Sequence, residues 1–171
     1  MKLIPLTKQT KMLTKQEIIW CMSSRRQHQI PTASFVIGAD VITPVSSVRD
    51  LGIYLDSDLS MRTHISKTVS ACFTVLRQLR SIHRIHRSVT RPFLQSLVAS
   101  LVLKRLDYGI STLAGLPVRQ LNRLQSVVNS AARLVYSARR SEHMSPLLRE
   151  LHWLRVPERI CLLYTSPSPR D

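Results

Sequence analysis

The spacing of apolar residues changes once along the chain, and this change restricts the fold more than any other feature. Before residue 58, apolar residues alternate with others, as at Leu51, Ile53 and Leu55, which is typical of strands with one buried face. From Ser60 onward they recur every three or four residues, which is typical of amphipathic helices. The sequence therefore predicts an α+β, mostly α fold, in which a short β-hairpin or small antiparallel sheet precedes a helical bundle.

Short β-rich pieces make up the predicted sheet. Residues 35–37 and 41–42 flank a Gly-Ala-Asp turn and should form a hairpin. Residues 48–55 should form one further strand, and residues 15–21 a short apolar strand that includes Trp20 as a core residue. Residues 23–31 are expected to form a loop.

The helical part should begin with one long amphipathic helix after Ser60. Its predicted buried face consists of Ile65, Val69, Cys72, Leu76 and Leu79. Thr90-Arg91-Pro92 is typical of a helix N-terminus, and the apolar segment 93–106 that follows should be the buried central helix. A further helix is expected over residues 118–137, with short helices at Ser145-Pro146 and at Pro157. The predicted inward residues of the helix over 118–137 are Val118, Leu121, Leu124, Val128, Ala131 and Val135.

The charge of the chain is strongly positive and unevenly placed. Twenty-five Lys and Arg stand against ten Asp and Glu, which gives a net charge of +15 among 171 residues. Residues 59–106 contain no acid, and residues 108–141 contain none either. A surface that serves only solubility would mix signs. The pattern instead indicates a polyanionic partner, either nucleic acid or an acidic membrane surface.

Arginines after residue 76 recur at helical spacing and are the first candidates for phosphate contact. At spacings of three, four and three they lie about one turn apart on a helix, and the guanidinium fork suits phosphate. This row consists of Arg77, Arg80, Arg84 and Arg87. Further candidates on the helical part are Arg62, Lys67 and Arg91, and weaker ones in the loop are Arg25 and Arg26.

Other kinds of site find little support in the sequence. Cys21, Cys72 and Cys161 have no CxxC spacing, which argues against a zinc site or a disulfide framework and fits a reducing, intracellular compartment. The longest apolar stretch is too short to span a membrane, and no signal peptide is expected. No Asp-Asp pair is present; Asp56 and Asp58 only imitate one, and Asp58 is expected to be a helix N-cap. No metal site is therefore predicted.

Four segments in a fixed order resemble the C-terminal part of a LINE-type (non-LTR) retrotransposon reverse transcriptase, over roughly residues 15–160. They are residues 47–56 (SVRDLGIYLD), 105–109 (RLDYG), 121–134 (LNRLQSVVNSAARL) and 151–160 (LHWLRVPERI). The resemblance implies a palm-edge hairpin followed by a thumb-like helical region. It also implies an RNA-directed DNA polymerase as the parent protein, working in the nucleus or cytoplasm.

The resemblance further implies partners and roles. The helical region would grip an RNA template and a DNA primer or product duplex, beside the palm and fingers of the same polyprotein. The parent enzyme would use Mg²⁺ on two acids that this sequence lacks, so the chain alone is expected to be inactive. Lys15 matches a palm lysine that can assist proton transfer to pyrophosphate; the alternative is a surface lysine, because Met12 and Gln16 depart from the motif. Asp107 is expected in a buried polar turn, accepting backbone N–H bonds.

Four regions follow along the chain. Residues 1–14 are ill-defined, residues 15–58 form the palm-edge hairpin region, and residues 59–160 form the basic thumb-like region. Residues 161–171 resemble a translated sequencing adapter and are expected to be a non-native tail. Two alternatives stay open: a decayed or truncated element copy without a working function, and a basic amphipathic protein at a membrane surface.

Overall fold

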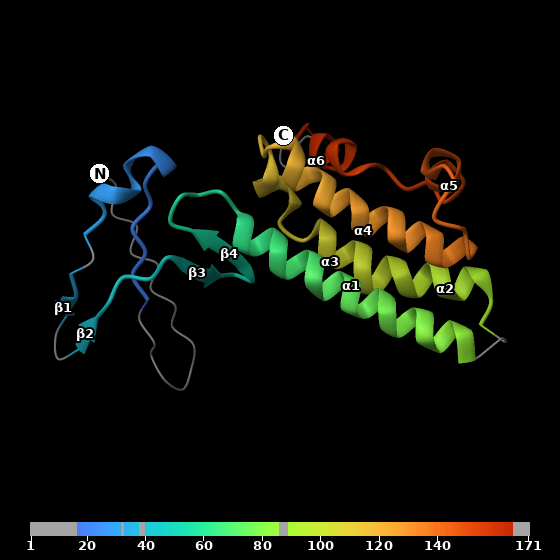
Figure 1. Ribbon diagram of the computed structural model, residues 1–171, viewed down its shortest axis with the longest axis horizontal. Helices are drawn as coiled ribbons and strands as arrows, with labels where there is room; N and C mark the ends of the chain where they lie inside the picture. Colours follow the sequence, from blue (N-terminus) through green and yellow to red (C-terminus); the bar gives the residue numbers. More distant parts are fainter. Residues whose placement is uncertain (1–16, 32, 38–39, 86–88, 166–171) are drawn as a thin grey trace, which may run out of the picture. The chain divides into compact units, whose positions relative to one another are not determined.

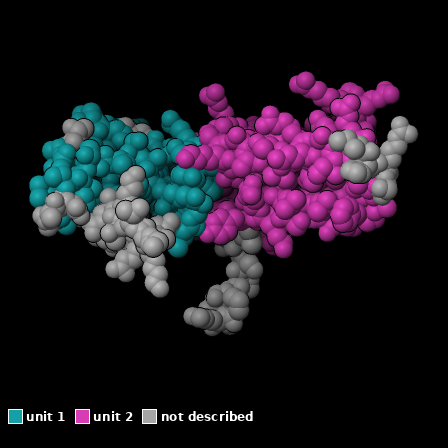
Figure 2. Space-filling view, turned by 90° about the horizontal axis from the view of Figure 1, so that it is seen from below, with its two compact units in different colours: residues 1–64 teal, residues 65–171 magenta. Residues whose placement is uncertain are grey.

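The computed structural model describes residues 17–31, 33–37, 40–85 and 89–165. The chain divides into two compact units, Met1–His64 and Ile65–Asp171 (Figure 2). Within the described ranges the first unit contains all of the β-strands, and the second unit is built from helices. The predicted fold class, α+β and mostly α, is therefore confirmed.

The first hairpin lies where the sequence places it. β1 (Phe35–Ile37) pairs antiparallel with β2 (Asp40–Ile42), and Val36 lies opposite Val41. The turn residues 38–39 lie outside the described residues. The hairpin is short, with three residues of each strand paired (Figure 1).

A second hairpin occupies the segment predicted as one strand. β3 (Ser47–Asp50) pairs antiparallel with β4 (Ile53–Asp56). The single strand predicted for residues 48–55 is therefore wrong, because Leu51 and Gly52 reverse the chain. Their φ angles are 44° and 87°, and a two-residue turn with both φ angles positive matches the twist of paired strands. Glycine reaches such an angle without steric cost.

The segment before the first hairpin differs from its prediction in two places. The strand predicted for residues 15–21 is absent from the described part of that segment. Its Ile18 carbonyl accepts the Val45 N–H, and just beyond it the Met22 N–H donates to the Ser57 carbonyl, so these two bonds join it to different segments. Ile19 and Trp20 are nevertheless buried, as expected for Trp20. The loop predicted at residues 23–31 contains a 3₁₀-helix, η1 (Ser24–Gln29).

The long helix α1 (Arg62–Ile85) begins in the first unit, where Asp56 caps it. An Asp56 carboxylate oxygen accepts a hydrogen bond from the Thr63 backbone N–H at 3.0 Å, which satisfies a donor of the first turn. The prediction that Asp58 caps this helix is wrong. Its carboxylate accepts the Ser60 backbone N–H at 3.0 Å and so stabilises the turn before the helix.

His64 is buried in the first turn of α1, close to this cap. Its Nδ1 accepts the backbone N–H of Tyr54 at 3.5 Å, a contact that needs an unprotonated nitrogen. Burial lowers the pKa of His64, and the nearby Asp56 carboxylate opposes this change only in part. The folded chain therefore binds a proton at this position less readily than the unfolded chain does.

Acidification should destabilise the first unit through His64. Because the folded-state pKa lies below the unfolded value of about 6.5, stability is fully present above that pH and is lost as the pH falls through the folded pKa. In a Trp153→Phe background, Trp20 fluorescence during urea unfolding reports on the first unit. The urea concentration at the unfolding midpoint should fall between pH 7.5 and pH 5.5, and His64→Gln should make this fall smaller. His28→Gln, at an exposed histidine, should leave the fall unchanged. An equal pH dependence of both variants would contradict this.

In the second unit, the apolar face of α1 is buried much as predicted. Ile65, Cys72, Leu76 and Leu79 are at most 5% exposed, and Val69 is half-buried. These residues recur at spacings of seven, four and three, so they lie along one side of the helix. The exposed residues of α1 include five cations, which are Arg62, Lys67, Arg77, Arg80 and Arg84.

The central helical row is interrupted and is not buried all round. It consists of α2 (Arg91–Val98), the π-helical segment η2 (Ala99–Leu103) and α3 (Lys104–Asp107). Thr90 is the N-cap residue as predicted, with Pro92 in the first turn. The prediction of burial on all sides over residues 93–106 is wrong, since Phe93 is 57% exposed and Leu101 is 45% exposed. The buried side comprises Leu94, Val98, Val102, Leu103 and Leu106.

Helix α4 (Val118–Tyr136) lies alongside α1 and the central row (Figure 1). Leu124, Val128, Ala131 and Val135 are buried as predicted, and Leu121 is half-buried. The prediction for Val118 is wrong, because its side chain is 70% exposed. Pro117 is the N-cap residue, so Val118 lies in the first turn, where the helix has not yet reached the core.

Short helices complete the second unit. They are η3 (Ile110–Leu113), α5 (Met144–Glu150) and α6 (Val156–Thr165). The two helices predicted near Ser145-Pro146 and Pro157 are confirmed within one or two residues. The segment 161–165, expected to be a non-native tail, continues α6, and residues 166–171 lie outside the described residues. None of the described helices is both long enough and apolar enough to cross a membrane.

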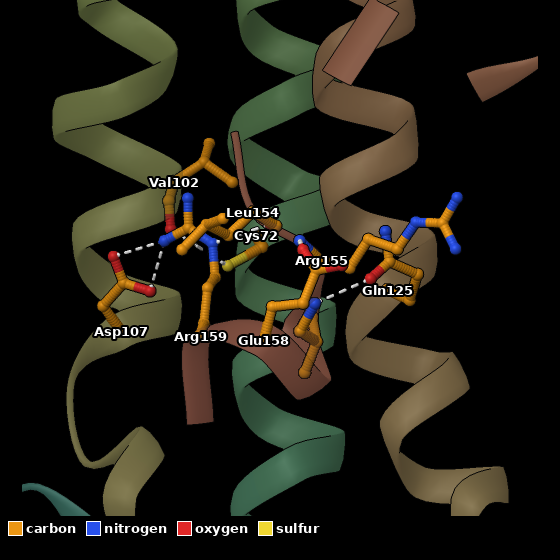
Figure 3. Close-up of polar contacts among 9 residues, drawn as sticks. Cys72, Val102, Asp107, Gln125, Leu154, Arg155, Glu158 and Arg159 are labelled. Atoms are coloured by element: carbon orange, nitrogen blue, oxygen red, sulfur yellow. Dashed lines mark hydrogen bonds and ion pairs between the residues drawn. The ribbon is translucent and has the colours of Figure 1, made fainter. Parts of the chain in front are cut away.

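Polar contacts join α6 to the helices beside it (Figure 3). One guanidinium nitrogen of Arg159 lies 2.6 Å and 2.7 Å from the two carboxylate oxygens of Asp107, and the Val156 N–H donates to Gln125 at 2.8 Å. The prediction that Asp107 accepts backbone N–H bonds in a buried turn is therefore wrong. A half-exposed carboxylate at the end of α3 instead pairs with a cation 52 residues further along the chain.

Candidate nucleic-acid interface

A basic groove runs between the second half of α1 and the second half of α4. It has a volume of about 680 Å³, and all of its lining residues belong to the second unit. The residues on its walls are Arg80, His83 and Arg84 from α1; Ser126, Asn129, Ser130, Arg133 and Leu134 from α4; and Ser137, Ala138 and Arg140 from the end of α4 and the segment after it. No acidic residue is among them, so the positive charges face one another without neutralisation.

Parallel alignment of α1 and α4 places these residues together. Near the start of the pair, the Arg123 guanidinium of α4 donates to the Ser66 hydroxyl of α1 at 3.1 Å. Further along, Arg80 and Arg84 of α1 face Arg133 of α4 across the groove. Ala131 and Ala132 are fully buried, and such small side chains allow α4 to pack closely against its neighbours.

Two residues of the groove each carry a buried side-chain nitrogen that has no hydrogen-bond partner among the described residues. These nitrogens are the Nδ1 atom of His83 and the Nε atom of Arg133. The other end of the Arg133 guanidinium donates to the Arg140 carbonyl at 3.3 Å. That bond holds one end of the guanidinium in place.

The structure separates the predicted arginine row into different environments. Arg80 and Arg84 are exposed and line the groove. Arg77 is exposed, donates to Thr74 at 3.2 Å, and is not among the lining residues. Arg87, like Lys15, lies outside the described residues. Of the three described arginines of the predicted row, Arg80 and Arg84 therefore line the groove and Arg77 does not.

The remaining predicted phosphate contacts lie elsewhere. Arg91 stacks over the ring of Tyr136, with 4.8 Å from its guanidinium carbon to the ring centroid. Arg62 is exposed and lies 4.0 Å from the Asp58 carboxylate. Arg25 and Arg26 are exposed on η1, and Lys67 is exposed on α1. Each of these could meet a phosphate only as a separate surface charge, since none lines the groove.

Sequence reasoning missed Arg133 and Arg140 as partners of the α1 arginines. Both belong to the acid-free segment 108–141, which was a usable signal of a basic surface. The apolar pattern of α4 predicts which of its faces is buried, but it does not predict what its polar face contacts. Arg133 and Arg140 share a groove with Arg80 and Arg84 because α4 lies alongside α1. Helical periodicity does not specify which helices lie side by side.

The groove is suited to anion binding and shows no feature of metal catalysis. Four guanidinium groups and one imidazole can donate to phosphate oxygens from two walls. Among the described residues no group of three or more His, Cys, Asp or Glu is placed to hold a metal ion.

The fold and the groove define a basic, mostly helical α+β protein with a concave surface that arginines line without an acid. Comparisons with protein-family models, curated proteins and solved structures found no match for the chain.

Proposed function

We propose that this chain contributes the grip on a primer–template duplex in an RNA-directed DNA polymerase of the retrotransposon type. The observation that carries the proposal is the groove between α1 and α4, in which Arg80, Arg84, Arg133 and Arg140 converge without an acid. Charge contacts of this kind hold a duplex through its phosphates and do not read its sequence. The four ordered segments that resemble a reverse transcriptase support the choice of partner.

The proposal assigns no catalysis to the chain. Polymerase chemistry uses carboxylates that hold two metal ions about 3.5–4 Å apart, and the sequence contains no pair of adjacent aspartates. Palm and fingers of the same polyprotein would supply the active site, and the working compartment would be the nucleus or cytoplasm. The 171-residue chain by itself is expected to bind duplex without extending a primer.

Salt dependence of binding tests the proposal. The chain should bind a fluorescent RNA/DNA hybrid, and the logarithm of its association constant should fall linearly with the logarithm of salt concentration. If three to five phosphates are neutralised, the slope measured on duplex DNA should lie near −2.7 to −4.5, at about −0.9 per phosphate. Binding at low salt no stronger than that of a neutral protein of equal size would refute the proposal.

The membrane alternative predicts a different result in the same assay. Vesicles of phosphatidylserine and phosphatidylcholine should displace the hybrid only weakly. The reason is that the phosphates of nucleic acid lie along a backbone narrow enough to enter the groove, whereas those of a vesicle lie on a broad surface. Unlabelled hybrid should compete fully. Strong displacement by vesicles together with weak displacement by hybrid would favour the membrane-surface protein.

A further inference from the structure

We infer that His83 and Arg133 form the floor of a single-phosphate site within the basic groove, holding one phosphate oxygen from each wall. This inference rests on the proposed function and makes it more specific. It assigns to two buried donors the phosphate contact that anchors the nucleic-acid backbone, with the exposed arginines around them. The ligand class is a phosphate diester or monoester oxygen.

The first argument is the state of the two donors. His83 Nδ1 and Arg133 Nε are shielded from solvent, yet neither has an acceptor among the described residues. Buried polar groups in folded proteins are nearly always paired, and an unpaired one calls for an explanation such as a ligand that binds there. The two atoms belong to residues that line the same groove. An acceptor bound in the groove would pair with both once the two side chains turn toward it.

The second argument is the charge of the surroundings. Arg80 and Arg84 flank His83 on α1, Arg133 faces it from α4, and Arg140 comes from the segment after α4. No acid is among the lining residues, so no carboxylate of the described residues serves as an acceptor there. Such surroundings repel a metal cation and attract an oxyanion with several acceptor oxygens. Phosphate meets this requirement and accepts from guanidinium groups in bidentate geometry.

The third argument is the geometry of Arg133. Its Nη2 donates to the Arg140 carbonyl at 3.3 Å, so part of the guanidinium is held by the protein itself. A positioned guanidinium loses less freedom on binding than an exposed, mobile one. Arg80 and Arg84, which are exposed, would add charge around a phosphate that Arg133 and His83 locate.

The test compares two substitutions of His83 in the full chain. His83→Phe removes the donor, whereas His83→Asn keeps an amide N–H near the position of Nδ1. Affinity for the fluorescent hybrid at 0.1 M salt should fall about tenfold in His83→Phe and less than threefold in His83→Asn.

A direct readout uses inorganic phosphate as the probe. Addition of phosphate should shift the imidazole NMR signals of His83, identified by their absence in His83→Asn, while the signals of exposed His28 stay in place. Circular dichroism confirms that each variant is folded. Equal affinities of His83→Phe and wild type, or unshifted His83 signals at saturating phosphate, would overturn the inference. The proposed function would survive that result if Arg80 and Arg84 variants still weakened hybrid binding.

Discussion

Changing Arg80 and Arg84 together to glutamine should weaken binding of an RNA/DNA hybrid about 60-fold at 0.1 M salt. Each lost phosphate contact removes about 0.9 from the salt slope, so the slope should become shallower by about 1.8. Extrapolated to 1 M salt, where released counterions contribute nothing, the two proteins should bind nearly alike. Glutamine keeps the helix propensity and much of the side-chain length, and both positions are exposed.

A charge-matched control separates the groove from the general field of the protein. Arg119→Gln combined with Arg149→Gln also lowers the net charge from +15 to +13, but these exposed residues do not line the groove. The control should lose less than about threefold in affinity and keep the wild-type slope within about 0.5. Equal losses in both double variants would show that total charge, and not the groove, holds the duplex.

Leu124→Ala should destabilise the second unit by about 2–5 kcal/mol, the usual cost of removing a buried leucine side chain. Leu124 is 1% exposed and lies on α4, which packs beside α2, α5 and α6. Because a unit of this size loses about 4–8 °C for each kcal/mol, the melting temperature should fall by at least about 8 °C. Thermal unfolding followed by circular dichroism at 222 nm measures this change.

Val118→Ala is the matched control on the same helix. Val118 has the apolar character and spacing of a core position, yet it is 70% exposed. Its truncation should change stability by no more than about 0.5 kcal/mol, as at other surface positions. A loss comparable with that of Leu124→Ala would mean that the first turn of α4 is buried.

Part of the fold could be read from local pattern alone. The helices α1 and α4 follow the period of 3.6 that brings Ile65, Cys72 and Leu76, or Leu124, Val128 and Ala131, to one side. The N-terminus of α2 follows from Thr90 and Pro92, since a proline in the first turn needs no backbone donor. These features depend on residues within a few positions of one another, so no knowledge of distant contacts is needed.

Other features depended on choices that local pattern leaves open. The alternation over residues 48–55 fits one strand or two, and the positive φ angles of Leu51 and Gly52 decide for a hairpin. Asp56 and Asp58 are equally good caps by composition. Asp56 takes the role because the chain turns through Ser60 and brings the Thr63 N–H within 3.0 Å of its carboxylate.

The candidate interface shows the same division. The acid-free segments predicted a polyanion-binding surface on the helical part, and Arg80 and Arg84 were identified from their spacing. Arg133, Arg140 and the unpaired His83 donor gained their place only from the packing of α4 against α1. Asp107 likewise met Arg159 across 52 residues, a pairing that no local spacing indicates.

The amino-acid sequence by itself determined the fold class, the main helices, the first hairpin and the sign of the surface charge. These properties are sums over neighbouring residues, and the chain carries them before it folds. Only the tertiary structure decided which arginines share a groove, which aspartate caps α1 and which donors are buried without an acceptor. Those outcomes depend on contacts between residues far apart in the sequence, because packing of apolar faces brings their polar neighbours together.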